Sequence, residues 1–404
     1  MPMVKNYAQF DGLHWETGTV RNVLAHLGVV APHTKQPLSE AMLLGISGGA
    51  VFGYFLFDYK GADPLLSLLS RNTFDPFETL LTRLAVPREQ RQTPDAAKAE
   101  ANLLNALESN QPAIVWADMF SLPYNDALLN DVWAMFPLVV FGVDGDTVHI
   151  ADRSCRPFTV GRAQFAAARA RVKKDKHRLL TLGAPDLAKL KDAVQKGIWQ
   201  SVALYTEKPP KGARTNFGFE AYRHWAAMLT NTRNPHSWAR FYPAGSAWWS
   251  AVVGDGFSPG LLGWIYTWGF GDGFERGAYA DFLDEAAVLL RHPKLAKAAE
   301  YFRSSRDAWL ALANIAMPDD VPLCREAREL KLRKHRLFIE SGQAALDEIH
   351  AANVRLREIR DLAAKNFPIT TTRLSAIHAA MSAQVMTIHD LEYEGIKAIQ
   401  AAMS

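Results

Sequence analysis

The order of hydrophobic and polar positions divides the chain into a mixed first half and a mostly helical second half. In the first half, apolar runs of strand length alternate with segments whose apolar residues recur every three or four positions. The runs predict strands and the three-to-four spacing predicts helices. After about Gly183 the helical pattern dominates. We therefore expect an α+β fold, with an antiparallel sheet in the first part and helices in the rest.

Capping and turn residues give the first-half elements their limits. Thr17 is expected to cap a helix that ends near Leu27, and Ser39 is expected to cap a short one. Asp144, Gly145 and Asp146 form a turn between two apolar runs, which is typical of a β-hairpin. The expected strands are residues 50–57, 113–120, 136–144 and 146–153.

The second half predicts packed helices and ends in two long ones, separated at Asn366-Phe367-Pro368. The apolar faces of these two helices suit either packing on the chain's own core or a homodimer contact, and the pattern leaves both open. Residues 236–276 are rich in Trp, Gly and Phe, which permits a mobile aromatic cover without demanding one. We expect three parts, which are residues 1–183, 184–340 and 341–404.

Composition and charge exclude several classes of protein. The net charge of +3 over 404 residues is too small for a nucleic-acid-binding protein. The basic run at 169–178 (RARVKKDKHR) could bind phosphates, although a solvated helix end is the simpler interpretation. No window has the ~20 apolar residues of a membrane span, and the N-terminus lacks a signal-peptide pattern. We expect a cytoplasmic protein without membrane contact.

Metal and cofactor chemistry find little support. Cys155 and Cys324 are far apart, and neither a CxxC motif nor a zinc-binding histidine motif occurs. Each cysteine is expected to be inert, because thiol reactivity requires a lowered pKa. The GISGG stretch at 45–49 lacks the Gly-Lys-Ser/Thr ending of a phosphate loop and indicates tight turns instead. We expect no metal and no cofactor.

The tetrad His14-Trp15-Glu16-Thr17 is the most specific candidate for chemistry. It lies where a loop is expected to enter a helix, and a helix start presents free N–H groups and a positive dipole end. A purely structural interpretation is a helix cap, a first-turn acid and a buried aromatic. Both interpretations remain open at this point.

Four stretches in order resemble the N-terminal domain of the butirosin biosynthesis protein H family. They are GLHWETGTVRNVLAHLG, PLSEAMLLGISGGAVFGYFLF, AIVWADMFSLPYN and VVFGVDGDTVHIADR. The resemblance implies a papain-like, cysteine-peptidase-like fold for residues 1–183, used for acyl transfer and similar to the peptidase domains that mature bacteriocins. FERGAYADFLDEAA resembles the helical domain of unknown function that commonly follows, and the helices after about residue 340 fall outside the resemblance.

The family also implies catalytic positions that this chain fills differently. Its nucleophilic cysteine would directly follow His14, where Trp15 stands. Its general-base histidine would precede the VVFGVD strand, in a stretch (133–137) without histidine, and we place it at Phe136. The carboxylate that orients this histidine corresponds to Asp152, which is retained. Tryptophan cannot form a thioester, so thiol catalysis is not expected.

Three functions remain open. The first is an atypical family member that binds or modifies a small or peptidyl amine or acyl ligand, in specialised metabolism. In it Glu16 and Asp152 are the candidate acid–base residues. The second is an active amide-forming acyltransferase with displaced catalytic groups, which would transfer an acyl group to an amine from an acyl carrier protein or another thioester. The third is a non-catalytic scaffold acting through its C-terminal helices. The expected ligand-binding residues are His14, Trp15, Thr17, Asp118, Tyr124 and Arg153.

Overall fold

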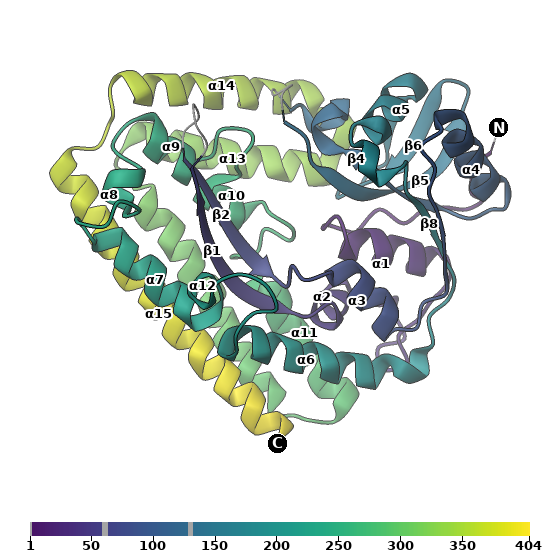
Figure 1. The fold of residues 1–404 in the computed structure, drawn as a ribbon, viewed down its shortest axis with the longest axis horizontal. Helices are drawn as coiled ribbons and strands as arrows, with labels where there is room; N and C mark the ends of the chain where they lie inside the picture. The colour runs from purple at the N-terminus through teal and green to yellow at the C-terminus, as the bar shows by residue number, and fades with distance from the viewer. Residues whose placement is uncertain (1, 59–63, 128–131) are drawn as a thin grey trace. The chain divides into compact units, whose positions relative to one another are not determined.

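A computed structural model describes residues 2–58, 64–127 and 132–404 of the chain. It contains two compact units, each assembled from separate stretches (Figure 1). The first, here called the sheet unit, consists of Met1–Leu43, Leu80–Leu190 and Lys334–Asn353. The second, the helical unit, consists of Leu44–Thr79, Lys191–Arg333 and Val354–Ser404. The boundaries expected at residues 183 and 340 stay predictions.

The sheet unit is built around a six-stranded antiparallel sheet. Its strand order is β3-β8-β4-β5-β6-β7, so β8, the last strand in the sequence, lies between β3 and β4. The strands are β3 (Arg88–Arg91), β4 (Ala113–Asp118), β5 (Met135–Asp144), β6 (Thr147–Ala151), β7 (Phe158–Gly161) and β8 (Leu179–Leu182). The predicted β5–β6 hairpin is confirmed. It turns at Gly145, whose φ of 57° suits glycine.

Three helices pack against this sheet. They are α1 (Thr17–His26) against β5, α4 (Ala96–Glu108) against β4, β5 and β8, and α5 (Arg162–Ala170) against β4, β6 and β7. Asp95 caps α4 by accepting a hydrogen bond from the Lys98 N–H at 2.9 Å. Each helix therefore gains its stability from the apolar face it lays on the sheet rather than from propensity alone.

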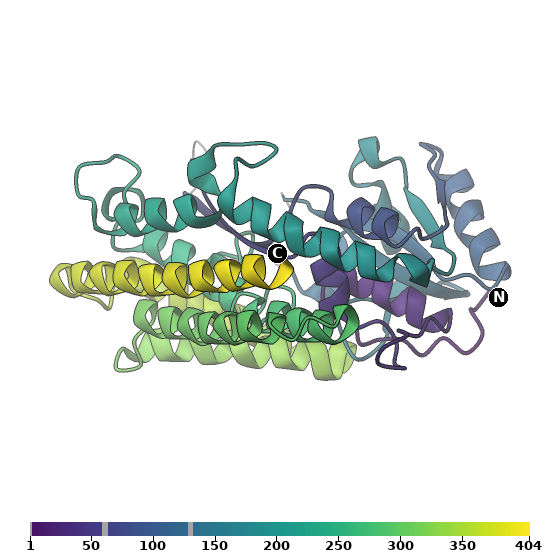
Figure 2. The same ribbon diagram turned by 90° about the horizontal axis from the view of Figure 1, so that it is seen from below.

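The helical unit surrounds the antiparallel pair β1 (Ala50–Phe57) and β2 (Leu65–Arg71) with helices. The long α15 (Thr371–Met403) runs beside α12 and α7 in both views (Figure 1, Figure 2). The other helices are α6 (Leu190–Thr206), α7 (Gly218–Thr230), α8 (Trp238–Phe241), α9 (Ser246–Val252), α10 (Gly260–Tyr266), α11 (Arg276–Leu290) and α12 (Leu295–Ala316).

Besides α6, whose first residue Leu190 belongs to the sheet unit, four further described helices have residues in both units. They are α2 (Glu40–Ile46), α3 (Pro76–Arg83), α13 (Pro322–Ser341) and α14 (Leu346–Lys365). Ser39 caps α2 as predicted, because its Oγ accepts a hydrogen bond from the Met42 N–H at 2.9 Å. The break predicted at 366–368 is also present, between α14 and α15.

The structure confirms the α+β class, with an antiparallel sheet first and a mostly helical C-terminal part. Strands β2, β3, β7 and β8 were not predicted from the sequence. The predicted strand 50–57 is present as β1 and belongs to the helical unit. The papain-like fold stays a prediction. Among the residues described, no helix is both long and apolar enough to cross a membrane.

The Trp-rich stretch 236–276 forms part of the core of the helical unit. Trp238, Trp248 and Trp249 are fully buried, and Trp238 packs edge-on against His378 of α15. The apolar face of α15 is likewise buried, with Ile377, Met381 and Ile388 turned inward. The chain's own core therefore covers this face, and self-association through the C-terminal helices stays a prediction.

Candidate functional site

The start of α1 is held by a carboxylate from the next helix. Glu40 of α2 accepts hydrogen bonds from the N–H groups of Leu13 and His14 at 2.7 and 2.9 Å, and from the Thr17 hydroxyl at 2.8 Å. All three interactions are shielded, because the side chains of Glu40 and Thr17 are buried. The predicted capping role of Thr17 is wrong, since α1 begins at Thr17 and its hydroxyl donates to Glu40 instead.

Two glycines allow the loop before α1 to lie directly on the helix. A Cβ atom on Gly12 would collide with the backbone of Gly18, and a Cβ on Gly18 would collide with that of Gly12. The Gly12 N–H donates to Asn22 Oδ1 at 3.1 Å, which joins the loop to the next turn of α1. This close approach requires glycine at both positions and presents the tetrad at the helix start.

His14 and Glu16 are occupied by local contacts. The Nδ1 atom of His14 accepts a hydrogen bond from the Glu16 N–H at 3.2 Å, and the His14 ring is buried against the edge of Trp15. His14 Nδ1 therefore acts as an acceptor in the loop just before α1.

Trp15 lies between an aromatic ring and a guanidinium group. Its ring stacks on Phe136 of β5, with 4.5 Å between centroids, and the Arg153 guanidinium carbon lies 4.4 Å from its centroid. Only 5% of Trp15 is exposed. A cation over an indole face at this distance is attracted by the ring quadrupole.

Arg153 is the centre of the cluster. Its Nε and Nη2 donate to the two Asp152 oxygens at 2.9 and 3.0 Å, and Nη2 also donates to Asn125 Oδ1 at 2.7 Å. On the side of α13, the Phe338 ring centroid lies 5.0 Å from the guanidinium carbon. The Arg153 backbone has a φ of 45°, a conformation that costs a non-glycine residue free energy.

Asp152 and Tyr124 complete this cluster. The Tyr124 hydroxyl donates to Asp152 Oδ2 at 3.0 Å, and burial together with the Asp152 charge holds the pKa of this phenol well above its usual range. The Tyr124 ring stacks on Phe158 at 4.1 Å. Tyr124 is therefore a permanent neutral donor, and Asp152 is an ion-paired carboxylate buried at the end of β6.

Asp118 is hydrogen-bonded to residues that lie between β4 and β5. Its carboxylate accepts hydrogen bonds from the N–H groups of Phe120 and Ala134 at 3.3 and 2.9 Å, and from the Ser121 hydroxyl at 2.5 Å. The structure thus brings together Trp15, Tyr124, Asp152 and Arg153 of the predicted residues. It gives Asp118, Thr17 and His14 supporting positions around them, and Glu16 takes part through its backbone N–H.

The C-terminal helices supply site residues that sequence reasoning missed. Besides Phe338, α13 carries His335, whose pKa is lowered to about 4 by burial and by the charges of Arg153 and Lys334. Lys334 Nζ donates to Asn353 Oδ1 at 2.8 Å, and Asn353 Nδ2 donates to Asp126 Oδ2 at 2.7 Å. The sequence held no signal for these contacts, because they join segments that lie far apart in the chain.

The two thiols are poor nucleophiles in this setting. Burial raises the pKa of Cys155, which follows the cluster in sequence, and burial raises the pKa of Cys324 to about 12. A thiol with a raised pKa holds little thiolate at neutral pH. Among the residues that the structure describes, no group of three or more His, Cys, Asp or Glu side chains could hold a metal ion.

With this geometry in place, the comparison with protein families is informative. Residues 14–153 match the family "Butirosin biosynthesis protein H, N-terminal". No curated protein matches the chain. The match begins at the tetrad and ends at Arg153, so it spans both ends of the Trp15–Arg153 contact. Within the matched residues, here called the butirosin H-type region, the rings of Trp15 and Phe136 are stacked. That these two positions replace a cysteine and a histidine of the family stays a prediction.

Proposed function

We propose that the butirosin H-type region binds a cationic amine without forming a covalent acyl-enzyme. The proposal rests on the groups that contact the Arg153 guanidinium. It lies between the rings of Trp15 and Phe338, at 4.4 and 5.0 Å, and is paired with the Asp152 carboxylate. Two aromatic faces and one carboxylate form a recognised setting for a protonated amine or a guanidinium group. We call this set of residues the cation cage.

In this structure the protein's own Arg153 side chain occupies the cation cage. A ligand amine would replace that guanidinium, take its place on Asp152 and stack on Trp15. The positive φ of Arg153 agrees with such a site, because residues held in strained backbone conformations cluster at ligand-binding sites. The ligand class agrees with an ancestry in acyl transfer to amines, since an amine acceptor would use the same carboxylate.

Replacing Arg153 tests the cage directly. Arg153→Gly suits the local backbone and empties the cage, so added ethylguanidinium should bind this variant and raise its melting temperature in a concentration-dependent way. Butanol is neutral and should neither bind this variant nor raise its melting temperature. The exposed neighbour Arg156→Gly is the control and should show no such response. An ethylguanidinium response that is equal in both variants would overturn the proposal.

The wild-type protein should bind amines more weakly than Arg153→Gly, because the ligand must displace a resident cation. Ligand-observed NMR with ethylguanidinium and butylamine measures this difference. Trp15→Leu in the Arg153→Gly background should abolish the binding, whereas the same change at the exposed Trp133 should leave it intact. Binding that survives the loss of Trp15 would contradict the cation cage.

The rival function is an acyltransferase with displaced groups, for which Thr17 is the candidate because its hydroxyl donates to Glu40 at 2.8 Å. Incubation with an acyl thioester, followed by intact-protein mass spectrometry, distinguishes the acyltransferase from non-covalent amine binding. We expect no acyl adduct on the wild-type protein. An adduct that maps to Thr17 or Cys155 would favour the transferase and would refute non-covalent binding as the whole function.

A further inference from the structure

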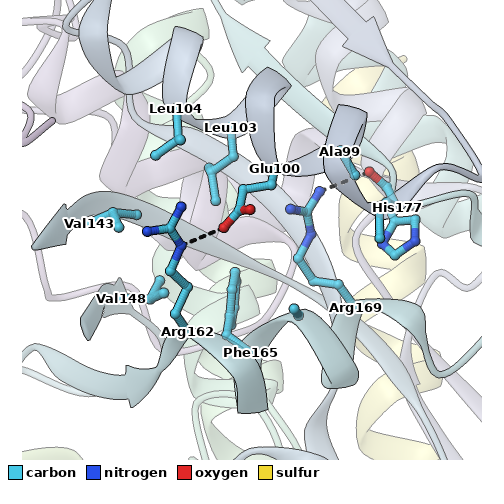
Figure 3. Close-up of a pocket in the computed structure, with 12 residues that line it drawn as sticks. Ala99, Glu100, Leu103, Leu104, Val143, Val148, Arg162, Phe165, Arg169 and His177 are labelled. Carbon is cyan, nitrogen blue, oxygen red and sulfur yellow. Dashed lines mark hydrogen bonds and ion pairs between the residues drawn. The ribbon is translucent and has the colours of Figure 1, made fainter. Parts of the chain in front are cut away.

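A small cavity lies in the sheet unit between α4, α5 and the β5–β6 hairpin. Its volume is about 40 Å³, and its apolar wall is formed by Leu103, Leu104, Val143, Val148 and Phe165 (Figure 3). The exposed Ala96 and Ala166 stand at its rim. A cavity of this size has room for roughly three waters, or for the head group of a small ligand.

Arg169, which lines this cavity, has one N–H donor without a hydrogen-bond acceptor among the described residues. Arg169 is 4% exposed, and its Nη2 donates to the His177 carbonyl at 2.9 Å. Its Nε is buried and has no hydrogen-bond acceptor among the residues the structure describes. Burial lowers the pKa of Arg169 to about 10, so the group stays cationic at neutral pH. A buried charged donor without an acceptor is costly, which points to a ligand that supplies one.

The charges around the cavity favour a single negative charge. Arg162 is ion-paired with Glu100, and Figure 3 shows the Arg162 and Arg169 guanidinium groups on either side of that carboxylate. Arg162, Arg169 and Glu100 together give the cavity lining a net charge of +1. Burial and the nearby Arg169 lower the pKa of His177, so its imidazole is neutral at pH 7.

We propose that this pocket binds a short-chain aliphatic carboxylate. Its carboxylate accepts the hydrogen bond from Arg169 Nε, and its alkyl chain packs against Leu103, Val148 and Phe165. A phosphate ion suits the pocket less well, because it brings more negative charge than one guanidinium neutralises and has no apolar part for the wall. The residues of this pocket are separate from the cation cage, so this proposal does not depend on the proposed function.

The experiment titrates butyrate into the full-length protein and follows binding by calorimetry and by ligand-observed NMR. Butyramide has the same shape without the charge, and inorganic phosphate has charge without the alkyl chain. We expect saturable binding of butyrate, with butyramide and phosphate each weaker by about tenfold or more. If butyrate does not saturate, or if butyramide binds equally well, Arg169 does not select a carboxylate and the proposal fails.

Two pairs of variants locate the binding. Arg169→Met should abolish butyrate binding. Because the loss of a buried arginine can impair folding, Ala166→Leu provides a second test by filling the rim from an exposed position of α5. Its matched control, Ala167→Leu, changes the next exposed position, which does not line the cavity. Butyrate binding should be lost in the first and kept in the second. Equal affinity in both would place the ligand elsewhere and overturn the proposal.

Discussion

Each unit of the molecule holds an arginine–carboxylate pair among aromatic rings, and the two pairs differ in how completely they are enclosed. In the helical unit, Arg276 and Glu392 are fully buried, with Nε donating to Oε1 at 2.7 Å. Glu392 also accepts hydrogen bonds from Tyr222, Ser305 and Trp309, at 2.8, 2.7 and 3.3 Å.

The remaining donors of Arg276 are satisfied by backbone carbonyls. They reach Ser70, Val51 and Phe274 at 2.6, 3.1 and 3.2 Å, so β1, β2, α11 and α15 meet at one guanidinium. Arg153 in the sheet unit differs, because it has ring faces on two sides, a partly exposed side chain and a strained backbone. The first pair is therefore a structural junction, whereas the second is less enclosed, as the proposed exchange for a ligand requires.

The largest expected effect comes from opening the junction. Glu392→Gln leaves Arg276 buried without its countercharge and should lower the free energy of unfolding by roughly 3–5 kcal/mol. Chemical denaturation measures this loss. The control on the same helix is Glu394→Gln, which removes an exposed pair with Lys397 and should cost under about 0.5 kcal/mol. Similar losses in the two variants would mean that the junction is not structural.

The second effect concerns the aromatic wall of the cation cage. Trp15→Ala removes a buried ring that stacks on Phe136 and should cost roughly 3 kcal/mol of unfolding free energy. Trp133 belongs to the same unit and is half exposed, so Trp133→Ala should lower the unfolding free energy by less than about 1 kcal/mol. If the two changes cost the same, Trp15 does not support the cage as described.

The third effect is pH dependence, which both units should share. Burial, aided at His335 by Arg153 and Lys334, lowers the pKa of His335 and of His378 to about 4 from the ordinary 6.5. Between pH 6.5 and 4 the unfolded chain takes up these protons and the folded protein does not, so stability falls as the pH falls.

Replacing either histidine by glutamine should make the loss of stability with acid shallower, by up to about 1.4 kcal/mol for each pH unit. Denaturation midpoints measured from pH 7 to pH 4.5 give this slope. If His335→Gln leaves the slope of the wild-type protein unchanged, then the α13 histidine does not lie under the influence of the cation cage.

The smallest expected effect is that of Arg153→Gly on stability. Loss of the pair with Asp152 is destabilising, but Asp152 keeps the hydrogen bond from Tyr124, and water can enter the space left by the partly exposed Arg153 side chain. Glycine also relieves a φ of 45°, at a gain of about 1 kcal/mol. The unfolding free energy should therefore change by less than about 1 kcal/mol, as thermal and chemical denaturation would show. A loss as large as that of Glu392→Gln would erase the difference between the two pairs.

Local patterns predicted most of the elements, because helices and strands reflect which positions of a single segment are buried. The β5–β6 hairpin followed from its turn residues, β1 followed from its apolar run, and the break before α15 followed from Pro368. The short strands β3, β7 and β8 were missed. They have four residues each, and a pattern that short carries little periodicity.

For the candidate site, the sequence by itself determined the residue types. Through the family resemblance it implied that a tryptophan and a phenylalanine stand where a thiol and an imidazole were expected, and that Asp152 is retained. It could not show that Trp15 and Phe136 touch, that Glu40 holds the start of α1, or that Phe338 closes the cation cage. Those facts are decided by tertiary packing, because contacts between distant segments depend on which surfaces the folded chain buries together, and no local pattern records that choice.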